Sequence, residues 1–300
     1  MTPTYPYFGI HTFAGAPRGT ADTLADGIAV LGIPWDGGVG YRPGSRFGPQ
    51  TIREVSARYP FHGGYYDLEQ GTSILSTASM ADLGDADVVV TDVERTFSAI
   101  EETITTVIRR GIRPLVLGGD HSVSLPVVRG LSDRPLGVLQ FDAHLDYGDE
   151  FGGARYTSST VMRRVRELSQ VKSLIHAGIR GLRTLATTLS ETQQDGNAVV
   201  SASRLSARPD ALIEQLDGNL EWYVSVDLDV LDPSQAPGVS SPEPGGLAFS
   251  HLAAALATLR RRLRVVGCDV VELNPLVDPT GISALAAVYL ALICASLLEW

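Results

Sequence analysis

The sequence has few cysteines and no cysteine motif. Only two of its 300 residues are cysteine. Cys268 and Cys294 lie far apart in apolar stretches, without the CxxC spacing of a zinc cluster. We interpret both as reduced core residues, which are typical of a reducing compartment, and we expect a cytoplasmic protein.

An excess of basic residues and a long apolar segment are also lacking. The formal net charge is −10, so we expect no nucleic-acid partner and no anionic-membrane partner. The first residues have neither the basic region nor the apolar region of a secretion signal. The apolar stretch at residues 284–298 is roughly 15 residues long, shorter than the about 20 needed to span a bilayer. We interpret it as a helix in the core or at a subunit interface.

No internal repeat and no linker rich in Pro, Gly or Ser divides the chain, so we predict a single domain over residues 1–300. Residues 1–26 form an N-terminal extension, packed on this domain or on a neighbouring subunit. Apolar strand-like runs alternate with segments of helical periodicity, which indicates a mostly parallel sheet covered on both faces, in a three-layer α/β/α sandwich. Strands are predicted at 27–33, 114–117, 136–141, 173–179, 198–201, 222–226 and 263–271. Helices are predicted at 91–110, 160–168, 211–216 and 250–260, from 123, and from 283.

Five acidic residues and two histidines stand in three short segments, each of which follows or ends a predicted strand. The segments are residues 118–122 (Gly-Gly-Asp-His-Ser), 142–146 (Asp-Ala-His-Leu-Asp) and 226–230 (Val-Asp-Leu-Asp-Val). In sheets of this class, ligands bind beyond the carboxyl ends of the strands. The position of the segments therefore favours a common site.

The spacing within these segments suits metal ions. Residues i and i+2 of an extended segment project to the same side, so Asp142, His144 and Asp146 line one face. Asp227 and Asp229 do the same, and His121 arrives after a Gly-Gly turn. Oxygen-rich ligand sets with one histidine per ion favour Mn²⁺ over Zn²⁺. Two such ions can share a water and lower its pKa, which indicates hydrolysis.

Each segment alone has a simpler interpretation. An isolated Asp-x-Asp is usually a solvated turn, and Asp120 or Ser122 would serve equally well as a helix N-cap. The three segments together, all at strand ends, favour the metal site.

These segments resemble the signature motifs of the ureohydrolase family, which includes arginases, agmatinases and guanidino-acid hydrolases. Further family segments are matched by residues 31–36, 42–49, 237–238, 242–246 and 271–275, so the resemblance covers nearly the whole chain. It implies an arginase-like fold with a roughly eight-stranded sheet. It also implies two Mn²⁺ per subunit and a homo-oligomer, either a hexamer or a trimer.

The resemblance also implies individual roles. His121, Asp142, Asp146 and Asp227 would hold one Mn²⁺; Asp142, His144, Asp227 and Asp229 would hold the other. Asp146 would in addition accept the proton of the bridging water and pass it to the leaving amine. Glu272 would pair with the substrate guanidinium.

The loop after the second motif indicates the substrate. It lacks the arginase pattern and looks like that of agmatinases, and Asp149 or Glu150 would favour a cationic tail. We therefore expect hydrolysis of agmatine to urea and putrescine, in polyamine metabolism. Arg155 in the same loop, or Arg42, would instead suit a carboxylate, as in a 4-guanidinobutanoate hydrolase. Both arginines could equally well hold loops or subunit contacts.

One position departs from the family pattern. Ser158 stands where most members have a histidine that is assigned to proton shuttling or substrate contact. Serine does not titrate near neutral pH, so we expect slower turnover or a more alkaline optimum. The same departure leaves open a non-catalytic, metal-stabilised homologue. A zinc deacetylase of related fold is disfavoured, because one metal would leave the second ligand set unexplained.

Overall fold

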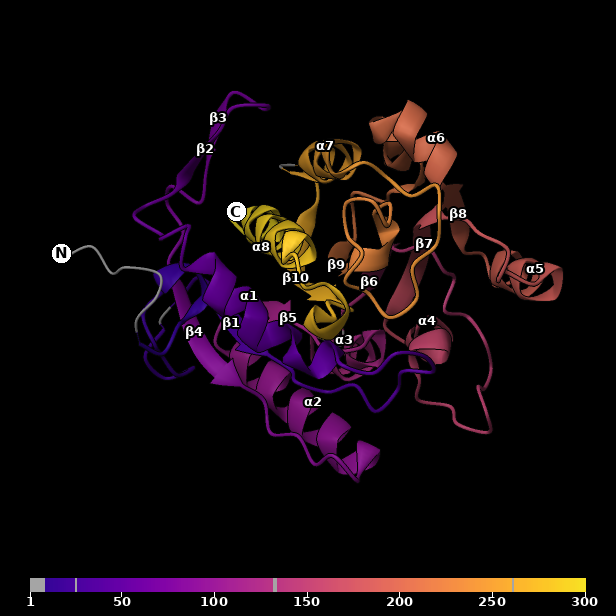
Figure 1. The fold of residues 1–300 in the computed structure, drawn as a ribbon, viewed down its shortest axis with the longest axis horizontal. Coiled ribbons are helices and arrows are strands. Elements are labelled where there is room, and N and C mark those ends of the chain that lie inside the picture. The colour runs from indigo at the N-terminus through magenta and orange to yellow at the C-terminus, as the bar shows by residue number, and fades with distance from the viewer. Residues whose placement is uncertain (1–8, 25, 132–133, 261) are drawn as a thin grey trace.

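A computed structural model describes residues 9–24, 26–131, 134–260 and 262–300. Within these ranges, eight parallel strands form one sheet in the order β4-β1-β5-β10-β9-β6-β7-β8 (Figure 1). The strands are β1 (Ile28–Gly32), β4 (Met80–Asp85), β5 (Arg113–Leu117), β6 (Leu136–Phe141), β7 (Val171–Ile179), β8 (Ala198–Ser201), β9 (Glu221–Asp227) and β10 (Arg264–Val271). This architecture confirms the predicted α/β class and the parallel, roughly eight-stranded sheet.

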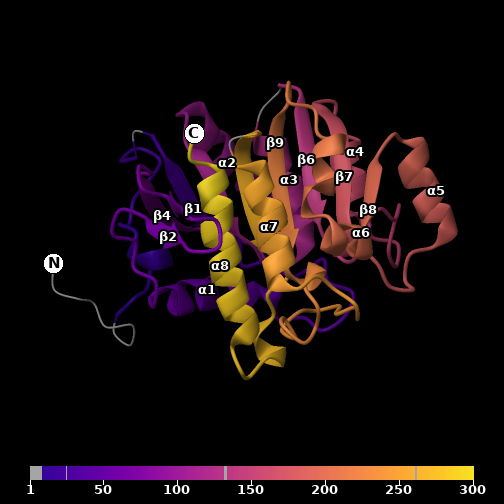
Figure 2. The ribbon, with the colours of Figure 1, turned by 90° about the horizontal axis from the view of Figure 1, so that it is seen from above.

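Helices cover both faces of the sheet (Figure 2). One face carries α1 (Gly48–Ser56), α6 (Ala202–Ala207), α7 (Phe249–Leu259) and α8 (Ile282–Leu297). The other carries α2 (Val93–Arg109), α3 (Ser124–Leu131) and α4 (Val161–Arg166), and α5 (Ala186–Gln194) lies beside β8 at the edge. The three layers of the predicted sandwich follow from this arrangement.

Short elements connect these layers. A separate antiparallel hairpin consists of β2 (Tyr65–Asp67) and β3 (Thr72–Ile74). The 3-10 helices are η1 (Phe13–Gly15), η2 (Ser45–Phe47), η3 (His121–Val123), η4 (Ser158–Thr160), η5 (Pro209–Gln215), η6 (Leu228–Val230) and η7 (Pro275–Val277).

The core explains why the central strands are apolar at every position. All six residues of β6 are buried. Val138 packs into the apolar cluster on one face, and its neighbour Leu139 packs into the cluster on the other. Successive strand residues project to opposite faces, so a strand covered on both sides needs continuous apolar sequence.

The N-terminal extension contributes to this core where the structure describes it. Phe13 and Ala14 are fully buried. The Phe13 N–H donates to Asp82 at 2.8 Å, and the Ala14 N–H donates to the Ser56 hydroxyl at 2.8 Å. Residues 1–8 and 25 of the predicted extension lie outside the described residues.

Cys268 and Cys294 are buried free thiols. The apolar C-terminal stretch forms most of α8, which packs on α1, α7 and β10. No helix in the described ranges is long and apolar enough to cross a membrane.

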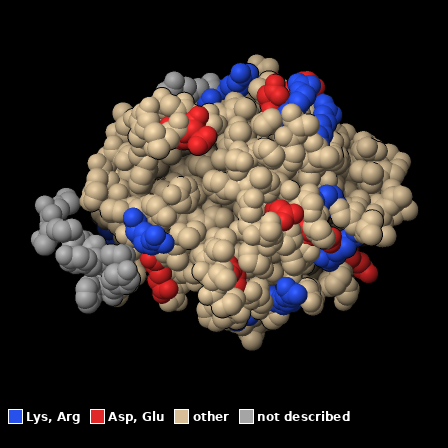
Figure 3. All heavy atoms as spheres, turned by 45° about the horizontal axis from the view of Figure 1, so that its top comes forward, with Lys and Arg blue, Asp and Glu red and all other residues tan. Residues whose placement is uncertain are grey.

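On the face shown in Figure 3, acidic and basic side chains lie in small separate groups, and neither sign forms a continuous patch.

Several elements differ from the sequence prediction. The helix predicted at residues 211–216 is the 3-10 helix η5. β4, α1, α5, α6 and the β2–β3 hairpin were not predicted. β4 contains Asp82 and Asp85, and charged residues are unusual in a strand of a covered sheet. Both carboxylates pair with Arg53 in α1, a contact that the sequence does not reveal.

Candidate metal centre and active-site cavity

The three acidic segments meet at the carboxyl ends of neighbouring strands. His121 follows β5, Asp142 follows β6, and Asp227 ends β9. The turn after β5 depends on Gly119, since a Cβ there would lie 1.8 Å from the carbonyl oxygen of Trp35. Glycine at this position brings the chain close to the 33–36 segment and directs His121 towards β6 and β9.

Two groups of ligand atoms result. His121 Nδ1 lies 3.0 Å from an oxygen of Asp142, 3.0 Å from Asp146 and 3.3 Å from Asp227. His144 Nδ1 lies 3.3 Å from Asp142 Oδ1. It also lies 3.0 Å from Asp229 Oδ2.

Within each group, the donor atoms lie within 4.8 Å of one another. Asp142 offers one oxygen to each group, as expected of a bridging ligand. Asp227 belongs to the His121 group only, whereas the sequence prediction also assigned it to the other ion.

These atoms fit a cation better than they fit one another. A single ring nitrogen shares at most one proton, so hydrogen bonds from His121 Nδ1 cannot satisfy three carboxylates. Burial, with repulsion from Asp229 and Asp142, raises the pKa of Asp227 well above its ordinary value. Burial and the charge of Asp142 raise the pKa of Asp146 to about 7. Positive ions among these carboxylates would offset the repulsion.

The ligands are held in place by residues that the sequence analysis did not single out. His121 Nε2 lies 2.9 Å from the Ser225 hydroxyl, which donates to Asp269 at 2.7 Å. Gln140 donates to Asp142 at 2.6 Å. Contacts of this kind fix the orientation of a metal ligand. Their only sequence signal is polar residues inside otherwise apolar strands.

The alternative interpretation of the first segment is also correct. Asp120 caps η3 and accepts a hydrogen bond from the Ser122 N–H at 2.9 Å. Capping by Asp120 leaves the adjacent His121 free to face the carboxylates. Asp120 therefore caps the 3-10 helix, while the adjacent His121 is a candidate metal ligand.

Glu272 follows β10, between the strands that bear His121 and Asp227. Its Oε1 accepts hydrogen bonds from the His121 N–H at 2.9 Å and the Ser158 hydroxyl at 3.0 Å. Its Oε2 is buried and has no partner within the described ranges. Burial raises the pKa of Glu272 to about 7. A buried carboxylate oxygen without a partner is an acceptor available to a ligand.

Two functional candidates have left-handed backbone conformations. Glu272 has φ of 68°, and Asp146 has φ of 48°. Such conformations cost of order 1–3 kcal/mol in a residue other than glycine, and they cluster at functional sites. Here they turn both carboxylates towards one cavity.

That cavity has a volume of about 400 Å³. Its inner wall includes His144, Asp146, Asp227, Asp229, Ser158 and Glu272. Its rim includes Tyr41, Glu150, Phe151, Arg183, Thr184, Leu185 and Thr188. Arg183 was not predicted, although its place just after β7 is the same kind of strand-end signal that identified the metal ligands.

The structure brings neither Asp149 nor Arg155 to the cavity. Asp149 pairs with Arg164 at 2.8 Å. Arg155 lies 3.7 Å from Glu167 and 4.0 Å from Asp149. Both were candidate substrate contacts, and their side chains instead form ion pairs with each other, Arg164 and Glu167.

Arg42 is likewise absent from the cavity lining. Its carbonyl oxygen accepts from Asn274 at 2.8 Å and from the Ser240 hydroxyl at 3.2 Å. Its guanidinium lies over the ring of Tyr41. These contacts agree with the alternative in which this arginine holds a loop.

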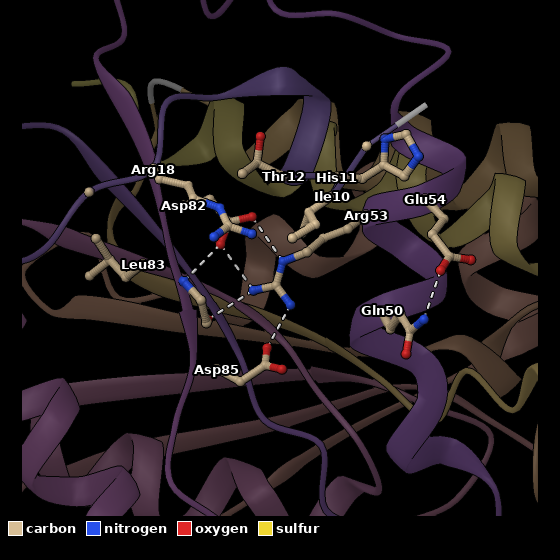
Figure 4. A pocket seen from close by; sticks show the side chains of 13 residues that line it. Ile10, His11, Thr12, Arg18, Gln50, Arg53, Glu54, Asp82, Leu83 and Asp85 are labelled. Carbon is tan, nitrogen blue, oxygen red and sulfur yellow. Dashed lines mark hydrogen bonds and ion pairs between the residues drawn. The ribbon is translucent and has the colours of Figure 1, made fainter. Parts of the chain in front are cut away.

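A larger cavity of about 660 Å³ lies away from these strand ends, beside α1 and β4 (Figure 4). Its most buried charges are matched: Arg53 donates to Asp82 at 2.8 Å and pairs with Asp85 at 2.6 Å. No described residue there has a free buried acceptor of the kind found on Glu272. The smaller cavity, with its ligand atoms and Glu272, is therefore the candidate active site.

Comparison with known proteins agrees with this geometry. The Arginase family model matches residues 26–296, and the chain belongs to that family. It is similar to the guanidinopropionase of Pseudomonas aeruginosa, with 36% identity over 96% of this chain and 92% of the relative. It is also similar to the agmatinase of Bacillus anthracis, with 32% identity over 87% and 88% of the two chains.

A solved structure is similar along its whole length. The proclavaminate amidino hydrolase of Streptomyces clavuligerus superposes with a TM-score of 0.88 and 30% sequence identity, covering 98% of this chain and 99% of that one. The family and the relatives together indicate a hydrolase that acts on guanidino groups. The relatives' names differ in substrate, so they do not single out one guanidino compound for this chain.

Proposed function

We propose that this protein is a Mn²⁺-dependent ureohydrolase that cleaves a small guanidino compound to urea and a primary amine. The observation that carries the proposal is the unpartnered Oε2 of Glu272, buried beside two groups of potential metal ligands in one cavity. Two Mn²⁺ would be held by the His121 group and by the His144 group. Bound cations of this kind lower the pKa of a shared water and offset developing negative charge.

The protein's own residues would orient the substrate. Glu272 Oε2 accepts an N–H of the guanidinium, while Ser158 and the His121 N–H hold Oε1. The charge of the carboxylate strengthens that hydrogen bond. Asp146, whose backbone turns its carboxyl into the cavity, accepts a proton from the attacking water and returns it to the departing nitrogen as the C–N bond breaks.

Urea release tests this function directly. Protein loaded with Mn²⁺ is assayed with agmatine, L-arginine, 3-guanidinopropanoate and 4-guanidinobutanoate. Glu272→Gln is expected to lower kcat/KM by at least about tenfold, because it removes a charge-assisted hydrogen bond to the guanidinium. Glu102→Gln, on the exposed side of α2, is the matched control and should leave kcat/KM unchanged.

Absence of urea from all four substrates would favour the alternative, a non-catalytic homologue stabilised by metal. Equal activity of the Glu272→Gln and Glu102→Gln variants would remove Glu272 from the mechanism. Agmatine, with putrescine as the product, remains the substrate that the sequence favours. Of the two acidic residues behind that preference, Glu150 lines the cavity and Asp149 does not.

A further inference from the structure

One basic side chain at the rim of the active-site cavity has no counter-charge. Arg183 is exposed and lines the cavity, and no ion pair joins it to any other residue in the described ranges. Two nearby arginines behave differently: Arg155, in the loop before η4, and Arg164, in α4, both contact carboxylates. Arg183 thus presents an uncompensated positive charge to whatever enters the cavity.

The residues around Arg183 add hydrogen-bond donors. Thr184 and Thr188, one and five residues further along the chain, also line the cavity. Leu185 also lines the cavity and is the N-cap residue of α5. Its side chain makes no capping hydrogen bond to the N–H groups in the first turn of the helix. A guanidinium, hydroxyls and the positive end of a helix all favour an anion over a cation.

The other end of the cavity is complementary to a guanidinium. Glu272 and the metal-ligand groups line the inner wall, so a substrate bound there presents its far end to the rim. Tyr41, Phe151 and Leu185 expose 57%, 48% and 65% of their surfaces at that rim, and they suit a short alkyl chain. Glu150 is the one acidic residue of the rim lining among the residues that the structure describes.

We propose that Arg183 binds a carboxylate on the substrate tail, so that guanidino acids are preferred over agmatine. This inference rests on the proposed function and names its substrate class. A tail carboxylate would pair with Arg183, whereas the ammonium of agmatine would face the same positive charge. At the rim, only Glu150 among the described lining residues would attract the ammonium. Arg183 would repel it, and the threonine hydroxyls and the N-terminus of α5 favour an anion.

Steady-state kinetics with two nearly isosteric substrates tests the proposal. Agmatine and 4-guanidinobutanoate differ mainly in the charge of the tail. Arg183→Ala is expected to raise KM for 4-guanidinobutanoate at least about tenfold with little change in kcat, and to leave KM for agmatine unchanged or lower. Arg183→Glu should raise KM for 4-guanidinobutanoate further and lower KM for agmatine.

Arg155→Ala is the matched control, because it removes an exposed arginine of the adjacent loop that lies outside the cavity lining. Arg183 has no ion pair to lose, and thermal unfolding of each variant checks that the fold is kept. Higher kcat/KM for agmatine than for the guanidino acids, or equal effects of Arg183→Ala and Arg155→Ala, would overturn the carboxylate assignment. Lack of urea from every substrate would instead contradict the proposed function.

Discussion

His176 shows how a single residue can support a site without belonging to it. Its Nδ1 contacts Gln140 Oε1, and Gln140 donates to the candidate ligand Asp142. The ring of Tyr147 lies edge-on at 5.8 Å. The His176 side chain is fully buried in β7.

Burial gives His176 a measurable role in stability. Burial lowers the pKa of this histidine to about 3. The charge of Asp142 acts in the opposite direction and raises the pKa, whereas His121 lowers it slightly further. The unfolded chain takes up a proton near pH 6.5, but the folded protein does not. His176 should therefore reduce the free energy of unfolding by about 1.4 kcal/mol for each pH unit as pH decreases from about 6.5 towards 3.

Denaturant unfolding between about pH 4 and 6.5 checks this contribution. His176→Gln should reduce the slope of stability against pH by one proton. His62→Gln, which removes an exposed histidine, serves as the control. Parallel slopes for His176→Gln and the parent protein would show that His176 does not titrate as proposed.

The residues of the site differ in how far the sequence alone predicts their positions. The candidate metal ligands were predictable, because spacing and strand ends place Asp142, His144 and Asp146 together whatever the details of packing. Glu272 needed the family motif. Asp149 was misplaced, since a loop sequence does not reveal that an ion pair with Arg164 turns the side chain outwards.

At the scale of elements, the buried strands were the predictable part of the fold. The β6 and β8 boundaries match the prediction at both ends, because these strands read as short apolar runs. The edge strand β4 and the helix α1 were missed. The two elements are joined by hydrogen bonds from Arg53 in α1 to Asp82 and Asp85 in β4, so neither is recognisable from its own sequence alone.

Arg53 joins α1 to β4 and is expected to be essential for stability. Its side chain is 9% exposed and pairs with Asp82, which is 2% exposed (Figure 4). Arg53→Met would leave Asp82 buried without a counter-charge, at a cost of about 3–5 kcal/mol in the free energy of unfolding.

Asp85→Asn is the matched control for Arg53→Met. The Asp85 side chain is 44% exposed, so breaking its pair with Arg53 should cost no more than about 1 kcal/mol. Both values come from denaturant unfolding at neutral pH. A cost for Arg53→Met no larger than that for Asp85→Asn would show that the buried pair does not connect the two elements energetically.

At the scale of the whole molecule, the sheet order explains why distant segments form one site. β5, β10, β9 and β6 are neighbours, so His121, Glu272, Asp227 and Asp142 meet although 151 residues separate His121 from Glu272. The sequence identified the separate segments, but the order of the strands depends on the complete fold. The homo-oligomer and the cytoplasmic location stay predictions.

The number of bound Mn²⁺ ions per chain tests the central claim most directly. After loading and removal of free metal, elemental analysis should find about two ions in the parent protein and in Asp149→Asn, an acidic control outside the cavity. Asp142→Ala should bind fewer than about one, because both ligand groups lose a shared carboxylate. Two ions retained by Asp142→Ala, or none bound by the parent protein, would contradict the account.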